Sequence, residues 1–123
     1  MAASKRPPLV TWSVLRRLED EFDDPAPARS FVRDFIAYWD DRYLRLVHTV
    51  EGGDAAASLD ALLSVRITAT MIGATRLARL TADLESSLKR GDLAAVAEAL
   101  PEMKDCAAAT IRELTRKYVN TER

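Results

Sequence analysis

Residues 54–92 read DAAASLDALLSVRITATMIGATRLARLTADLESSLKRGD. Asp54 stands immediately before a run of apolar residues spaced three or four apart, and Gly73 and Gly91 interrupt that spacing. Aspartate is a favoured N-cap of helices, and glycine ends them because it adopts the left-handed backbone conformation without strain. This stretch therefore predicts two helices, one that begins after Asp54 and runs to Ile72, and one that covers about residues 74–90.

The chain before this stretch predicts a short helix and a long one. Pro7 and Pro8 lie in a segment, residues 1–10, that we expect to be a flexible tail. Thr11 or Ser13 can cap a short helix, which should end at the acidic and proline-rich run 23–27. From residue 28 to residue 50 a single apolar stripe recurs at helical spacing and predicts a long helix. The stripe consists of Phe31, Val32, Phe35, Trp39, Tyr43, Leu46 and Val50.

The chain after Gly91 predicts one further helix. Asp92 is placed to cap it, and apolar residues at helical spacing continue from Leu93 to Tyr118. Pro101 lies inside this pattern, where its missing N–H group should kink or divide the helix.

These elements predict an all-α fold. Four long helices joined by connections of about two to four residues favour an antiparallel up-down-up-down four-helix bundle. We expect residues 11–123 to form this single domain, with the short extra helix near the N-terminus closing one end. The 20 alanines and 15 leucines agree with this fold class, because both residues are strong helix formers.

Composition excludes several classes of function. The net charge of −1 provides no positive field for a nucleic acid or an anionic membrane, so we expect neither as a partner. One cysteine, Cys106, and one histidine, His48, are too few for an internal disulfide or for a zinc site, and we expect no metal and no cofactor. Residues 1–10 contain no apolar run of signal-peptide length, and no stretch approaches 18 uncharged apolar residues, so we expect no membrane span and a cytoplasmic protein.

Motifs of catalysis are missing from the sequence. It contains neither a glycine-rich phosphate loop nor a G-x-S-x-G elbow, and it offers no base to activate Cys106. Acidic pairs such as Asp40 and Asp41 are adjacent in sequence, so on a helix their side chains diverge by about 100°. The sequence therefore predicts a protein that is not an enzyme.

One spacing pattern resembles a known family. Gly73 and Ala74 are followed by an L-x-x-L-x-x-x-L-E run, and Gly91-Asp92 closes the segment. The run consists of Leu77, Leu80, Leu84 and Glu85. This order is similar to the phosphoacceptor helix and the following helix of histidine-containing phosphotransfer (HPt) domains. The resemblance extends over most of residues 12–118, and it implies a helical bundle of phosphorelay signalling whose partner is the receiver domain of a response regulator or a sensor kinase.

The phosphoacceptor position departs from the family pattern. Counted ten residues back from Gly73, the position of the phosphorylated histidine holds Leu63, the neighbouring lysine position holds Arg66, and a glycine position holds Ile67. An aliphatic side chain has no lone pair with which to attack an aspartyl phosphate. The resemblance therefore implies a scaffold without its chemistry. Arg66 keeps the positive charge, so we expect it to retain an electrostatic preference for the acidic pocket of a receiver domain.

Helical geometry predicts what this helix presents to its surroundings. At about 100° per residue, one side fits the core and the other points outward. The core side consists of Ser58, Ala61, Leu62, Val65, Ala69 and Ile72. The outward side is our candidate docking face for a receiver domain, with no catalytic residue, and it consists of Leu59, Asp60, Leu63, Arg66, Ile67 and Thr70. Leu59, Leu63 and Ile67 form an apolar ridge along it.

Two alternatives remain open. The first is an active phosphotransfer protein that uses His48 as its phosphoacceptor, although His48 lies near the end of the preceding helix, about 9 Å along the axis from Leu63 in a helical hairpin. The chain could also be a structural bundle unrelated to phosphorelays, with the ridge as the seam of a homodimer. Burial of the ridge by the chain itself would remove the docking interpretation and leave the fold.

Overall fold

The computed structural model describes residues 6–120, and every regular element within them is helical. This confirms the all-α class. The elements are α1 (Trp12–Glu21), α2 (Pro25–Glu51), α3 (Ala55–Ile72), α4 (Thr75–Lys89), α5 (Leu93–Leu114) and a π-helical turn, η1 (Thr115–Val119).

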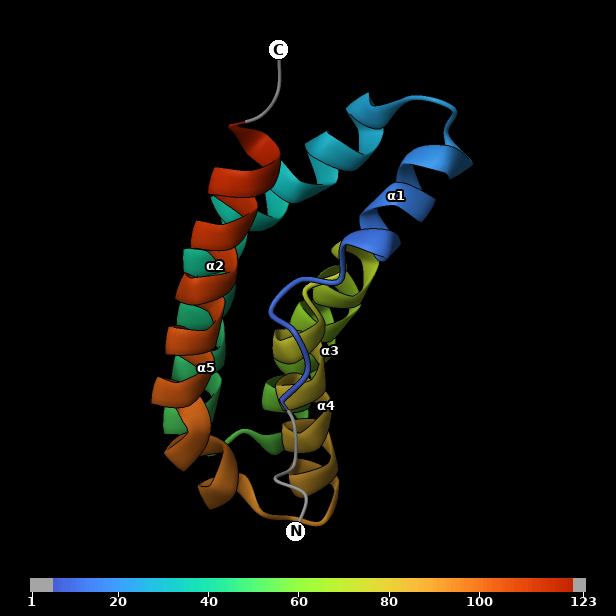
Figure 1. The fold of residues 1–123 in the computed structure, drawn as a ribbon. Coiled ribbons are helices and arrows are strands. Elements are labelled where there is room, and N and C mark those ends of the chain that lie inside the picture. The colour runs from blue at the N-terminus through green and yellow to red at the C-terminus, as the bar shows by residue number, and fades with distance from the viewer. Residues whose placement is uncertain (1–5, 121–123) are drawn as a thin grey trace, which may run out of the picture.

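The four long helices contact one another in a ring. Each helix from α2 to α5 packs against the next one in the chain, and α5 also packs against α2. Helix α1 contacts α2 and α3 and lies at the end of the molecule where α3 turns into α4 (Figure 1). The first turns of α2 extend past this end (Figure 1).

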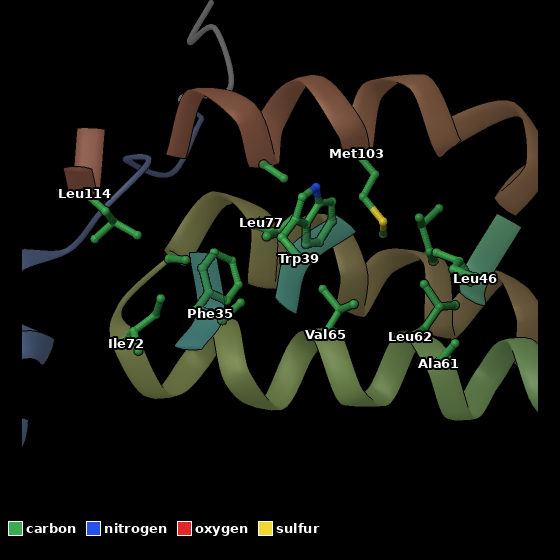
Figure 2. Close-up of a cluster of buried hydrophobic side chains, with 14 of the residues drawn as sticks. Phe35, Trp39, Leu46, Ala61, Leu62, Val65, Ile72, Leu77, Met103 and Leu114 are labelled. Atoms are coloured by element: carbon green, nitrogen blue, oxygen red, sulfur yellow. The ribbon is translucent and has the colours of Figure 1, made fainter. Parts of the chain in front are cut away.

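The core is built from one side of each long helix. Figure 2 shows side chains of all four helices converging between the ribbons. Trp39 of α2 and Met103 of α5 lie between Leu62 of α3 and Leu77 of α4. Leu62, Leu77 and Met103 are completely buried, so the interior is a continuous apolar layer between the four helices.

The helix ends predicted for α3 are confirmed. The Asp54 carboxylate accepts a hydrogen bond from the backbone N–H of Ala57 at 3.0 Å, as an N-cap does. Gly73 ends the helix in the left-handed conformation, with φ 80°. Asp92 caps α5 in the same way, through the N–H of Ala95.

The structure differs from the predicted helices at the start of α2 and at the end of the chain. Helix α2 begins at Pro25 rather than at residue 28, because prolines are tolerated in the first turn, where N–H groups lack helical partners, and Asp24 caps it. Of the two outcomes expected at Pro101, a kink or a division, the structure excludes division, because α5 continues through this residue to Leu114. The last turn, to Val119, is π-helical instead of α-helical.

The C-terminal turn is attached to the first two helices. The Tyr118 hydroxyl donates a hydrogen bond to the Glu19 carboxylate at 2.5 Å, and the Arg29 guanidinium lies 5.6 Å from the centre of the Tyr118 ring. Burial and the Glu19 carboxylate both raise the pKa of the Tyr118 hydroxyl, which keeps it a donor at neutral pH.

Part of the expected tail is packed against the domain. Residues 1–5 lie outside the described residues, but Val10 is buried and the Thr11 N–H donates to the carbonyl oxygen of Gly73 at 2.8 Å. Arg76 donates through its backbone N–H to Pro8 and through Nε to Pro7. The packed part of the chain therefore begins before the expected boundary at residue 11.

Gly73 lies in close contact with the residues that lead into α1. A Cβ atom on Gly73 would lie 2.7 Å from the Thr11 carbonyl oxygen and 3.0 Å from the Val14 Cβ, and its φ disfavours any side chain. We expect Gly73→Ala to lower the free energy of unfolding by about 2 kcal/mol, through left-handed strain and overpacking together. Gly91→Ala is the matched control, because φ there is 83° and nothing lies within 4 Å of the added atom. Equal losses for the two variants, measured by denaturant unfolding, would refute the close contact at Gly73.

Helix α3 has the length and apolar character of a membrane span, with a mean hydropathy of 1.4 over its 18 residues. One such helix is weak evidence for a membrane span, because a mostly buried core helix passes the same test; one third of α3 is buried inside the bundle. The high hydropathy arises because α3 is apolar on its outer side as well as on its core side.

Candidate docking surface

The rotation of α3 about its axis is the one that its sequence predicts. All six residues of the expected core side are buried: Ser58, Ala61, Leu62, Val65, Ala69 and Ile72. The polar member of this set has a partner, since the Ser58 hydroxyl donates to the Thr49 hydroxyl of α2 at 3.0 Å. The opposite side of α3 therefore faces outward.

The apolar ridge on the outer side is exposed. Leu63 is 36% and Ile67 is 50% exposed, whereas Leu59 is half-buried against the core. Thr70 is exposed beyond them. The described residues at the N-terminus cover neither Leu63 nor Ile67, so burial by that segment, the main alternative to a free surface, is not what the structure shows.

The two charged residues of the predicted face are both paired within the chain. On one flank the Asp60 carboxylate accepts from the Arg45 guanidinium of α2 at 2.8 Å, with both side chains more than half exposed. An exposed pair of this kind contributes little to stability. It does place a neutralised charge, rather than a free carboxylate, at the edge of the ridge.

Arg66 has a role that its sequence position did not reveal. Its Nε donates to the Glu85 carboxylate of α4 at 2.5 Å, and the Glu85 side chain is 7% exposed. A buried carboxylate is costly unless a cation compensates it. Glu85 therefore largely neutralises the positive charge that was expected to attract an acidic partner. As a result, the outer face of α3 is more apolar than the sequence indicated.

The exposed apolar surface extends further than the predicted face. Met71 continues the ridge one turn beyond Ile67 and is also exposed. On the adjacent face of α2, Phe31 and Tyr38 are exposed, although Phe31 was assigned to the buried stripe. Phe31 and Met71 line one shallow hollow of about 210 Å³ between α2 and α3. The exposure of Met71 could have been predicted, because it lies four residues after Ile67 and so on the same side of α3. The exposure of Phe31 and Tyr38 depends on how α2 is rotated about its axis.

His48 lies apart from the ridge. It is exposed in the last turn of α2, and the contact between Thr49 and Ser58 places this turn beside the start of α3. Leu63 is five residues further along α3 than Ser58, which corresponds to about 7.5 Å of helix rise. The structure therefore does not bring His48 to the position that Leu63 occupies.

Cys106 has the surroundings of a structural thiol. Burial raises its pKa, which keeps the thiol protonated and weakly nucleophilic near neutral pH. It lines a groove of about 680 Å³ between the N-terminal segment, α4 and α5, in which three arginines face four acidic side chains. These are Arg6, Arg76, Arg79, Asp83, Glu98, Glu102 and Asp105. Charges of both signs at a wide opening favour no single class of ligand.

No group of three or more His, Cys, Asp or Glu side chains suited to a metal ion occurs within residues 6–120. In comparisons with known proteins, no family model, no curated protein and no solved structure matches the chain.

Proposed function

We propose that this protein is an HPt-like binding module of phosphorelay signalling that carries no phosphoryl group. Its partner is the receiver domain of a response regulator or a sensor kinase, and it acts in the cytoplasm as an adaptor or as an inhibitor that competes with true phosphotransfer proteins. The docking face is the outer side of α3, with Leu63 and Ile67 at its centre.

The arrangement of the helices supports this proposal. Each long helix contacts its neighbours in a ring, and short turns connect them, as expected of an up-down-up-down four-helix bundle of the HPt kind. In such a bundle, one helix presents its outer side to the partner. Here α3 is that helix by its resemblance to the phosphoacceptor helix.

The observation that carries the proposal is the exposure of Leu63 at the phosphoacceptor position. A leucine kept only for the core would be buried, but this side chain is 36% exposed and continues into the exposed Ile67. Exposed apolar ridges of this kind mark surfaces that bind other proteins. Because Arg66 and Asp60 are already paired, apolar contact should supply most of the affinity.

Binding to purified receiver domains from the same cell tests the proposal. We expect at least one receiver domain, phosphorylated or not, to bind the wild-type chain, and Ile67→Asp to weaken that binding by more than about tenfold, since a desolvated charge would lie in the contact. Leu44→Asp is the matched control, because Leu44 is equally exposed on α2 but is not part of the α3 face. Isothermal titration of both variants measures the difference. Equal affinities for the two variants, or no binding by any receiver domain, would rule the docking face out.

Active phosphotransfer through His48 is the competing function. We expect no acid-labile phosphate on the wild-type chain after incubation with a receiver domain charged by acetyl phosphate, because Leu63 cannot accept it. If label does appear and is lost in His48→Gln, the chain is a phosphocarrier with a displaced histidine, and the non-catalytic proposal is wrong.

A further inference from the structure

A second apolar surface, which shares Ile67 with the docking face, lies between α2 and α3. We call it the α2–α3 patch, and it consists of Phe31, Tyr38, Ile67 and Met71, all exposed. Phe22 extends it, with its ring centre 6.3 Å from that of Phe31. Six of the seven large exposed apolar side chains in the described part of the chain belong to this patch or to its neighbour Leu63. Such a concentration on one side of a small domain indicates a protein interface.

Tyr38 is the most exposed member of the patch, at 53%, and charged residues flank it symmetrically. Asp34 lies four residues before it and Arg42 four residues after it, so one helical turn separates each from Tyr38 on the same side of α2. The Arg42 guanidinium lies 6.0 Å from the centre of the Tyr38 ring. Asp34 and Arg42 both line the hollow between α2 and α3. Between residues 6 and 120, neither forms an ion pair with another side chain.

The order Asp34, Tyr38, Arg42 along α2 is self-complementary. If two copies of α2 cross antiparallel about a two-fold axis at Tyr38, Asp34 of each copy faces Arg42 of the other. A two-fold interface repeats every contact twice, so a single sequence feature supplies two ion pairs around a central pair of tyrosine rings. The net charge of −1 adds almost no repulsion between the copies.

We propose that the α2–α3 patch binds a second copy of this chain and forms a symmetric homodimer centred on Tyr38. The dimer requires no receiver domain or kinase, so it can form even if the proposed function is wrong. Ile67 belongs to both surfaces, however, so a second copy and a docked partner would compete for it.

Sedimentation velocity over a concentration series tests the dimer. We expect the wild-type chain to dimerise, and Asp34→Arg and Arg42→Asp each to weaken dimerisation about tenfold or more, because each change places two like-charged pairs in the interface. The double variant Asp34→Arg/Arg42→Asp should return to within a few-fold of the wild-type dissociation constant, since the swap restores both pairs.

Leu44→Ser and Tyr38→Ser form a matched pair of controls on the same helix. Leu44 is 52% exposed, but six helical positions place it about 120° around α2 from Tyr38. Tyr38→Ser should weaken the dimer, and Leu44→Ser should leave it unchanged, with helical content checked by circular dichroism. A wild-type chain that stays monomeric at all concentrations would overturn the proposal, and the patch would then be assigned to contact with a different protein. A dimer insensitive to the single changes, or a charge swap that fails to restore it, would also overturn it.

Discussion

Replacing Leu62 with alanine is expected to lower the free energy of unfolding by about 3 kcal/mol, whereas the same change at the adjacent Leu63 should cost well under about 1 kcal/mol. Leu62 is completely buried and lies in the core between the helices (Figure 2). Leu63 is 36% exposed. Truncation at Leu62 removes apolar contact and leaves a cavity that a tightly packed interior cannot close. Truncation at Leu63 leaves no cavity.

The two variants form a matched pair, because they make the same chemical change on the same helix. Denaturant unfolding measures both, and the slope of the free energy against denaturant should not change. We expect the opposite order in receiver binding, where Leu63→Ala should lose affinity and Leu62→Ala should bind normally while folded. Similar destabilisation by both variants would show that α3 is rotated differently, and the docking face would then be wrongly assigned.

Replacing Arg66 with alanine is expected to cost about 3 kcal/mol of unfolding free energy, although the residue lies partly at the surface. The Arg66 side chain is 37% exposed, but the Glu85 carboxylate that it binds is buried in the domain. Removal of the guanidinium would leave this carboxylate without its cation in a poorly solvated place. Arg45→Ala is the control, because Arg45 pairs with an exposed carboxylate and should cost well under about 1 kcal/mol.

A double variant separates the two possible roles of Arg66. If its role is to compensate Glu85, Arg66→Met/Glu85→Leu should recover most of the lost stability, because an apolar pair replaces an ion pair at little cost. If Arg66 instead serves only to attract a partner, Arg66→Ala alone would leave the unfolding midpoint unchanged and reduce receiver binding. That outcome would contradict a compensating role of Arg66 toward the buried Glu85 carboxylate.

A helix end could be predicted from the sequence where the local residues have one interpretation, and not where they have two. Asp54 and Gly73 act on hydrogen bonds and dihedral angles within a few residues, so the ends of α3 could be predicted. The start of α2 could not, because the proline-rich run after Asp24 suits either the end of one helix or the first turn of the next.

The candidate site was predictable in its shape but not in its electrostatics. Helical periodicity alone correctly separated Leu62 from Leu63, since a rotation of about 100° per residue needs no knowledge of the neighbours. The pairing of Arg66 with Glu85 spans 19 positions and depends on how α3 and α4 are placed against each other. The exposure of Phe31 and Tyr38 depends likewise on the rotation of α2.

The sequence by itself determined that this protein is helical and where α3 begins and ends, and it placed Leu63 on the side of α3 that faces away from the core. Only the tertiary structure decided that the charges beside this leucine are already paired, that residues 7–10 pack against the domain, and that the α2–α3 patch is exposed. The physical reason is the range of the interactions. Caps and periodicity act within one helix, whereas ion pairs and surface patches require side chains from different helices to lie side by side, and packing of the whole core sets that arrangement.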